Sequence, residues 1–247
     1  KDDGGTWVTG TSNTYTFSDL TTGTYNVKVR LTNGSGLTTT SSTLAITTTE
    51  IPTPTYSIDT TDWATKKVVT ITYPERQADF IYEYSTNGGS SWETVSSGTT
   101  ASVTFTSNGS VIARVRDGVN TKTASTYTVS KIDTTPPTSV SVSSGSITAS
   151  SIQVTANGTD WGSGIVKYEF SKDNGSSWVN NGTNRTYTFT GLSSFTTYNI
   201  KVRVTNGAGL QSVSNTTSIM TLERMTTYLI NNKVQNSVNA GESGLVR

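Results

Sequence analysis

The chain has 247 residues, a formal charge of +1 and only 14 % charged residues, so Ser, Thr and Asn carry most of its polarity. The near-neutral charge and the lack of a basic cluster argue against binding to nucleic acid or to anionic membranes. No apolar run approaches the ~18 residues of a membrane helix, which argues against membrane insertion. The absence of Cys and His excludes disulfides, thiolate or imidazole zinc sites and His-dependent nucleophilic catalysis, and we expect no cofactor.

A repeat starts at the first residue. "KDDGGTW" (1–7) matches the ends of "YEYSTNGGSSW" (82–92) and "YEFSKDNGSSW" (168–178), which places Trp7, Trp92 and Trp178 at intervals of 85 and 86 residues. A propeller blade repeats at about 40–50 residues, whereas an immunoglobulin-like sandwich needs about 100 or somewhat fewer. The interval therefore favours one sandwich per repeat.

A second repeated segment shows the period of a β-strand. "TYTFSDLTTGTYNVKVRLTNGSGL" (14–37) matches "TYTFTGLSSFTTYNIKVRVTNGAGL" (186–210), with one inserted residue. Apolar and polar residues alternate in this segment and near 110–116, which is typical of strands with one buried and one solvent face. The expected buried positions are Val27, Val29, Leu31, Val111, Ala113, Val115, Tyr198, Ile200, Val202 and Val204. Arg114 and Arg116 are expected to face outward.

These repeats divide the chain. Residues 1–49 are expected to be the C-terminal half of one sandwich, 50–132 a second sandwich and 133–221 a third, with "EIPTPT" (50–55) and "DTTPPT" (133–138) as proline-stiffened linkers. The fold class is therefore all-β, with tandem sandwiches of which the first is truncated. Strands are expected near 55–58, 67–73, 79–86, 91–95, 101–105, 110–116 and 123–130, and near 139–143, 151–156, 165–172, 177–180, 185–190, 197–205 and 211–219.

The last segment, 222–247, breaks the repeat. Leu222, Met225 and Leu229 are spaced to form one face of a short helix. The segment is expected to be a tail or the start of a further domain.

The segment 186–210 resembles the late strands of fibronectin type III domains. In that family a Leu and a Tyr about six residues later flank a strand turn, and Leu192 with Tyr198 fits, as does Leu20 with Tyr25 at one residue fewer. The resemblance implies that Tyr25 and Tyr198 are structural core tyrosines, with a buried ring and a hydroxyl bonded to the backbone. The second unit lacks this pair and is expected to be immunoglobulin-like only.

Two further motifs resemble segments of known protein families. The pattern Ser-x-Asp-x-Gly-x-x-Trp in 171–178 resembles the Asp-box hairpin of sialidase propellers, although the arginine cluster and Tyr–Glu pair of a sialidase are not visible. "DWGSGIVKYEFSKDNGSSW" (160–178) and the Asp-x-x-Pro-Pro linker resemble bacterial immunoglobulin-like repeats. The resemblance implies a secreted or wall-attached protein, extracellular or at the cell surface of a Gram-positive bacterium.

The hairpin residues are expected to stabilise the fold. Asp173 can accept hydrogen bonds from its own turn after Ser171, Gly175 supplies a positive φ, and Trp178 can cover the turn. The second unit carries Asn87, Gly89 and Trp92 at the matching positions. A turn anchor tolerates Asn in place of Asp, whereas acid catalysis does not.

The loop tryptophans Trp63 and Trp161 allow two interpretations. Each could plug the end of its sandwich, because large aromatic side chains are usually mostly buried. Alternatively each could be a ligand-binding platform on which a sugar stacks, with Asp160 beside Trp161 adding a hydrogen bond. The first interpretation is favoured.

Other polar residues allow structural alternatives as well. Asp133 is expected to be a solvated turn residue, and a calcium site there is the less favoured alternative, because calcium needs six to eight oxygen ligands. A Lys–Asn isopeptide bond from Lys67, Lys167 or Lys201 is a minor hypothesis.

The carboxylates do not indicate an enzyme. Glu83 and Glu169 hold matching strand positions and are expected to point to solvent, and no carboxylate pair is evidently opposed across a cleft. The leading hypothesis is a non-catalytic stalk or spacer of monomeric modules. The alternative is an adhesion or carbohydrate-binding module whose partners are cell-wall glycans, host glycans or matrix proteins.

Overall fold

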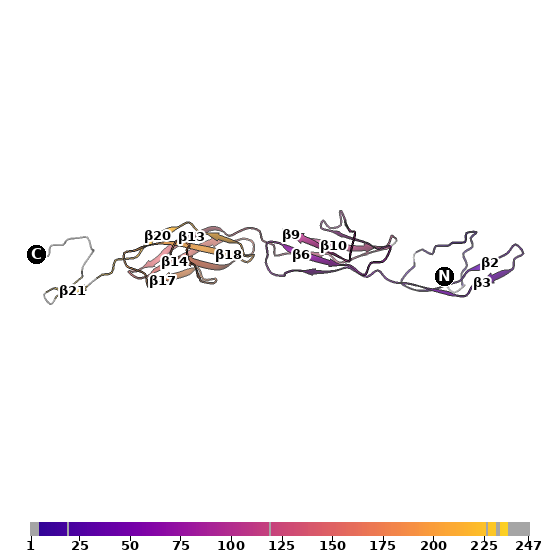
Figure 1. Ribbon diagram of the computed structural model, residues 1–247, viewed down its shortest axis with the longest axis horizontal. Helices are drawn as coiled ribbons and strands as arrows, with labels where there is room; N and C mark the ends of the chain where they lie inside the picture. Colours follow the sequence, from indigo (N-terminus) through magenta and orange to yellow (C-terminus); the bar gives the residue numbers. More distant parts are fainter. Residues whose placement is uncertain (1–4, 19, 119, 226, 231–232, 237–247) are drawn as a thin grey trace.

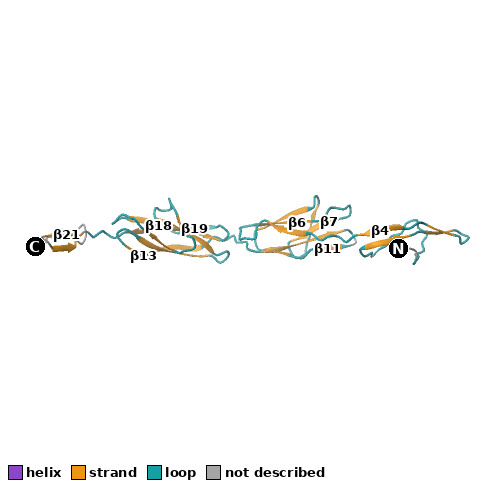
Figure 2. Cartoon of the chain, turned by 90° about the horizontal axis from the view of Figure 1, so that it is seen from below, coloured by secondary structure: helices purple, strands orange, loops and turns teal. Residues whose placement is uncertain are grey.

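The computed structural model describes residues 5–18, 20–118, 120–225, 227–230 and 233–236. Every regular element in this part of the chain is a β-strand, and every strand ladder is antiparallel, which confirms the expected all-β class of tandem sandwiches. The strands gather into bodies strung end to end along one axis (Figures 1 and 2). Within these ranges no helix is long and apolar enough to cross a bilayer.

The third module, residues 133–221 in the division proposed from the sequence, is a two-sheet sandwich. One sheet has the order β13-β14-β17, and the other has β16-β15-β18-β19 with β20 paired to β18. The strand bounds are β13 (Thr138–Ile147), β14 (Ile152–Thr159), β15 (Ile165–Ser171), β16 (Val179–Asn180), β17 (Thr186–Phe189), β18 (Thr197–Asn206), β19 (Gln211–Val213) and β20 (Thr217–Met220). Alternate residues of β14 and β18 are buried between the sheets with Phe170 and Phe189, as the period-two pattern predicts.

The second module, residues 50–132, repeats this architecture. The sheet β5-β6-β9 faces the sheet β11-β10-β7-β8, and β12 pairs with β10. The bounds are β5 (Thr55–Ile58), β6 (Lys67–Thr72), β7 (Ile81–Ser85), β8 (Glu93–Val95), β9 (Thr100–Phe105), β10 (Gly109–Arg116), β11 (Thr121–Thr123) and β12 (Tyr127–Val129). Its core contains Val111, Ala113 and Val115 together with the stacked rings of Tyr73 and Tyr82.

The last strand of each sandwich is broken, which the sequence did not predict. The segment expected as one strand over 211–219 forms β19 and β20, and the Ser214 hydroxyl between them accepts the Val202 N–H at 3.0 Å. Ser41 does the same for the Val29 N–H in the first module. In each case a side chain replaces one ladder partner, so the strand bends and pairs with a different part of its neighbour.

The first module, residues 1–49, contains only the late strands of a sandwich among its described residues. They are β1 (Gly23–Val27), β2 (Arg30–Thr32), β3 (Thr38–Thr40) and β4 (Leu44–Thr48), paired as β1-β4 and β2-β3. Val29 and Leu31 are 59 % and 66 % exposed, whereas their counterparts Val202 and Val204 are fully buried. The sequence pattern marks the same inward face in both modules, and only the third covers it.

The described part of the tail forms strands and not the short helix that its apolar spacing allowed. Residues Thr227–Ile230 (β21) and Lys233–Asn236 (β22) pair as an antiparallel hairpin, so the helical spacing of Leu222, Met225 and Leu229 is misleading. Leu222 and Met225 are exposed. The remainder of the segment expected as a tail or further domain, 237–247, lies outside the described residues.

Candidate functional site: the hairpins and the second junction

The hairpin of the third module is closed by its own side chains. The Asp173 carboxylate accepts hydrogen bonds from the Ser171 hydroxyl at 2.7 Å, from the Ser177 N–H at 2.9 Å and from the Ser177 hydroxyl. Gly175 has φ +94°, and an added Cβ there would lie 3.3 Å from the Trp178 ring. The ring therefore lies against the backbone of the turn.

The second module builds the same hairpin without the acid. Asn87 Oδ1 accepts the Ser91 N–H at 3.0 Å and the Ser85 hydroxyl at 2.7 Å, while Asn87 Nδ2 donates to the Ser91 hydroxyl at 2.8 Å. Gly89 has φ +90° and lies against the Trp92 ring. The amide reverses one hydroxyl bond and otherwise makes the same turn, so the geometry does not depend on a titrating group.

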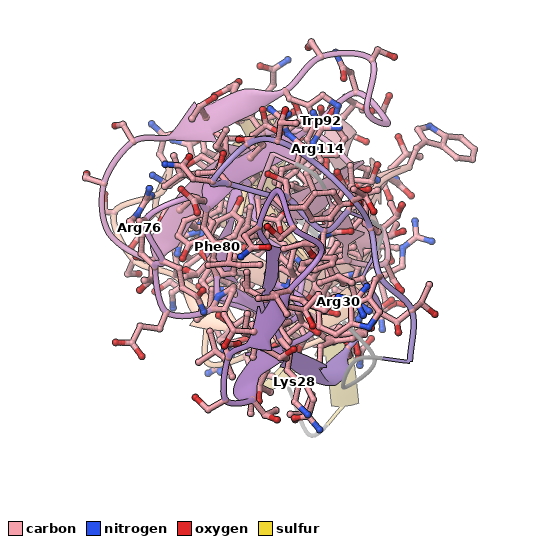
Figure 3. All side chains as sticks on the ribbon, turned by 90° about the vertical axis from the view of Figure 1, so that its right-hand side faces the viewer. Lys28, Arg30, Arg76, Phe80, Trp92 and Arg114 are labelled. Atoms are coloured by element: carbon pink, nitrogen blue, oxygen red, sulfur yellow. The ribbon has the colours of Figure 1, made fainter. Side chains whose placement is uncertain are left out.

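Each hairpin tryptophan also carries an arginine over its ring. The guanidinium of Arg114 lies 3.7 Å from the Trp92 ring centroid, and that of Arg203 lies 4.6 Å from the Trp178 centroid. Arg114 and Trp92 are labelled in Figure 3. In the first module Arg30 lies 4.4 Å from the Trp7 centroid. Residues 1–4, which complete the matching motif there, lie outside the described residues.

The expectation that Glu83 and Glu169 point to solvent is wrong. They are 6 % and 7 % exposed, because the cross-strand arginines lie over them. Glu83 accepts from Arg114 Nε at 2.7 Å and from Arg116 Nε at 2.8 Å. The two arginines lie on the outer face of the sheet, as expected, and fold over Glu83 there. Glu169 accepts from Arg203 Nε at 2.8 Å. Glu, Arg and Trp thus form one layered cluster on the second module and one on the third.

These hydrogen bonds predict a loss of stability in acid. The Arg116 hydrogen bond lowers the pKa of Glu83, the Arg203 bond lowers that of Glu169, and the Ser171 and Ser177 bonds lower the pKa of Asp173 to about 2. A pKa that is lower in the folded state adds stability above the unfolded value, near pH 4, and that stability is lost as pH falls through the folded value. Thermal unfolding followed by circular dichroism should therefore give a midpoint that is steady above about pH 5 and falls steeply below pH 4.

The Asn87 hairpin supplies the matched control for this experiment. Asp173→Asn should make the acid dependence of the third module shallower between pH 4 and 2, because the amide does not titrate, while Glu169 and Asp133 keep their own contributions. A midpoint that stays constant to pH 2 in the unaltered chain would contradict the prediction.

Asp133 is not the solvated turn residue expected from the sequence. It is 6 % exposed and lies where the second and third modules meet. Its N–H donates to the Ala64 carbonyl of the second module at 3.0 Å. Its carboxylate accepts from the third module, through the Ser163 N–H at 2.8 Å, the Ser163 hydroxyl at 2.6 Å and Asn206 Nδ2 at 3.0 Å. One residue therefore bonds to both modules, and its hydrogen bonds, led by that of Ser163, lower its pKa.

The side-chain amide of Asn206 bridges the two acids Asp133 and Asp160 as a hydrogen-bond donor. Its Nδ2 donates to Asp133, to Asp160 Oδ1 at 3.2 Å and to the Thr135 carbonyl at 3.0 Å. Its Oδ1 accepts the N–H groups of the following turn, which fixes the direction of the amide. The described residues contain no group of three or more acidic side chains placed to hold a metal. The donor set therefore does not fit the calcium alternative.

The backbone around the linker is held in an unusual conformation. Lys131 has φ +61° and Ser139 has φ +54°, a region that costs a non-glycine residue about 1–2 kcal/mol. Such strain persists only where the surroundings fix the backbone. Gly162 passes so close to the linker that an added Cβ would lie 2.5 Å from the Asp133 carboxyl.

The two loop tryptophans differ from each other. Trp63 is part-buried, whereas Trp161 is 95 % exposed, so the favoured interpretation that Trp161 plugs its sandwich is wrong. Asp160 does not lie free beside it, because Asp160 Oδ2 accepts the Gly164 N–H at 2.7 Å and Oδ1 accepts from Asn206. The loop that presents the exposed indole is thus fastened on both sides.

The two tyrosines near the strand turns have backbone-bonded hydroxyls. Tyr198 accepts the Ser193 N–H at 2.9 Å, and the Tyr25 hydroxyl donates to the Thr21 carbonyl at 2.8 Å. Both rings are only part-buried, less than the resemblance implies. Lys67 is buried, and Lys167 lies 3.2 Å from Glu169, so Lys167 belongs to the layered cluster. The isopeptide hypothesis stays a prediction.

Comparison with known proteins gives one family match, in the third module. Residues 135–241 match the fibronectin type III domain, which covers the third module and runs into the tail. Among solved structures, the chain is similar to the FN1–FN3 domains of chicken CNTN1, at 18 % identity and TM-score 0.36, covering 78 % of this chain and 76 % of that one. It is also similar to domains A168–A170 of titin, at 18 % identity and TM-score 0.45, covering 82 % and 75 %. No curated protein matches the chain.

The fold and the match define a class: a tandem β-sandwich chain whose third module is similar to fibronectin type III domains. Such folds typically serve as repeated structural or binding modules, and function is carried by the sites on them.

Proposed function

We propose that the chain is a stiff spacer, a row of sandwich modules that holds other parts of a protein apart. The observation that carries the proposal is Asp133, whose main chain bonds to the second module and whose carboxylate bonds to the third. A linker tied to both neighbours loses the freedom that a flexible linker keeps. The end-to-end arrangement in Figure 2 gives such a junction the geometry of a rod.

The two junctions are fastened differently. At the first junction, an exposed ion pair joins Glu50 to Lys122, and exposed ion pairs contribute little. Asp117 stands where the third module has Asn206, and a carboxylate cannot donate to a linker acid as the amide does. We infer a softer joint near 50–55 and a stiff one near 133–138, with modules at 1–49, 50–132 and 133–221.

The location that we propose is the outside of a bacterial cell, as part of a surface-attached or secreted protein. The support is the resemblance of residues 160–178 and of the Asp-x-x-Pro-Pro linker to bacterial surface repeats. A core of sheet hydrogen bonds and apolar side chains, in a chain without Cys, holds each complete module without a redox requirement.

Distances between spin labels test the stiffness directly. Because the chain has no Cys of its own, spin labels attach only to introduced cysteines. The pair that spans the junction is Thr104→Cys and Thr188→Cys, at exposed positions on β9 and β17. Electron paramagnetic resonance should give one narrow distance distribution across the junction. It should be nearly as narrow as that of the control pair Thr104→Cys and Thr128→Cys within the second module. A broad distribution across the junction would overturn the spacer proposal.

A second function, adhesion to glycans or matrix proteins, is favoured by one observation. Trp161 is 95 % exposed on a loop whose backbone is fixed. An indole that is 95 % exposed contributes little to the core of its module, and its open face is a surface on which a partner can stack.

A further inference from the structure

The junction brings two Asp-Trp loops together from different modules. Trp63 directly precedes Ala64, whose carbonyl accepts the Asp133 N–H. Trp161 lies two residues before Ser163, which donates to the Asp133 carboxylate. Chain reach through these bonds keeps the two tryptophan Cα atoms within roughly 23 Å of each other. The sequence separates these residues by almost a hundred positions, and a single linker residue brings their loops together.

The platform is rigid before any ligand arrives. Ser163 and Asp160, on either side of Trp161 and Gly162, are each hydrogen-bonded to buried partners in the linker or in β18. A fixed loop loses little conformational entropy when it binds, so an aromatic ring presented on it binds more tightly than one on a mobile loop.

The surroundings of Trp161 favour a sugar over a protein surface. At protein–protein interfaces, a tryptophan hot spot lies in a well-packed, desolvated pocket, and the contacts around it exclude water. The residues around Trp161, "NGTDWGSG" (157–164), are instead small, hydroxylic, amidic or acidic. A pyranose offers a face of C–H groups for the negatively polarised indole and a rim of hydroxyls for polar neighbours.

The charges of the site select against anionic polymers. Asp62 lies next to Trp63 and Asp160 next to Trp161, and Asp133 lies between the two loops. Lys66 and Lys131 are the cations of the adjoining segments, and both are exposed. Carboxylates beside both aromatic rings repel sulfated or uronic polymers, and the exposed carboxylate of Asp62 can accept hydrogen bonds from neutral sugar hydroxyls.

We propose that the junction of the second and third modules is a binding site for an extended neutral glycan, which stacks on Trp161 and reaches across to Trp63. The proposal rests on the fixed junction of the proposed spacer, because that junction sets the spacing of the two loops. A spacer with such a site also binds the polysaccharide through which it passes.

Titration calorimetry on the full chain tests the proposal with three probes. Cellohexaose and N-acetylchitohexaose represent neutral glycans, and a heparin hexasaccharide represents a polyanion. We expect at least one neutral hexasaccharide to bind, with little dependence on salt, and heparin not to bind. Trp161→Ala should weaken that binding by about tenfold or more, and Trp63→Ala should weaken it to a smaller extent.

The control is Phe195→Ala, which removes another exposed aromatic ring of the third module, outside the junction loops. It should leave binding unchanged. Trp161 is so exposed that its removal should not unfold the module, and thermal unfolding checks this point. Absence of binding to both neutral probes, equal binding by the Trp161→Ala chain, or preference for heparin would each overturn the proposal. The spin-label distances fail or succeed independently, so the spacer and the glycan site can be told apart.

Discussion

Replacing Asp133 with alanine should lower the free energy of unfolding of the third module by about 3 kcal/mol and loosen the junction. The change removes the acceptor of the Ser163 N–H and hydroxyl, the Asn206 amide and the Thr135 N–H, all in part-buried or buried positions. A buried donor left without a partner costs about 1–3 kcal/mol, and solvent entering the junction recovers part of that sum. Hydrogen exchange of peptides from 139–221, compared with peptides from 55–130, measures the effect module by module.

The linker offers a matched control in Thr134→Ala. Thr134 is exposed and adjacent, and its replacement should change stability by less than about 0.5 kcal/mol. Gly162→Ala should act in the same direction as Asp133→Ala, because its Cβ would lie 2.5 Å from the carboxyl. Gly158→Ala, where the nearest atom would lie 3.4 Å away, should be much milder. If the Asp133→Ala chain exchanges like the unaltered chain, the junction is not fastened as described.

Replacing Glu83 with alanine should destabilise the second module by about 2–3 kcal/mol. Glu83 is almost covered and accepts three hydrogen bonds from Arg114 and Arg116, so its loss leaves two adjacent arginines without their shared countercharge. The stack of Arg114 on Trp92 also depends on the direction that Glu83 gives to the guanidinium. Urea unfolding monitored by hydrogen exchange of residues 81–116 measures the change.

Glu75→Ala is the control for this prediction, because Glu75 is exposed in the same module. It should change stability by less than about 0.5 kcal/mol. Adding Arg114→Ala to Glu83→Ala should cost less than the sum of the two single changes, because the residues share one cluster. Additive effects, or a loss in Glu83→Ala no larger than in Glu75→Ala, would show that the cluster is a surface ion pair of little weight.

Local patterns predicted most of the fold. The strands near 197–205 and 110–116 follow from strict alternation, because every second side chain of a strand points to the same face. The hairpin around Gly175 could be recognised because its hydrogen bonds join residues within six positions of one another. The interval between the tryptophans indicated the size of one sandwich, because a repeat can be read directly from the sequence.

The burial of Glu83 and Glu169 was decided only by the tertiary structure. Alternation identifies which face a side chain occupies, but it does not show what lies over that face. The arginines that cover the two acids come from strands more than thirty residues away in sequence. The broken final strand had the same origin, because Ser214 bends it by bonding to Val202 of a neighbouring strand.

The candidate site shows the same division. The sequence identified Trp63, Asp160 and Trp161 as residue types suited to a ligand, because an aromatic residue next to an acidic one can be recognised from two adjacent letters of the sequence. Whether Trp161 is buried or exposed, and whether its loop meets that of Trp63, depends on Asp133 bonding to both modules. Burial and proximity are properties of the folded arrangement of distant segments. The sequence by itself therefore determined the alternating strands and their repeat, and only the tertiary structure decided how the sandwiches meet.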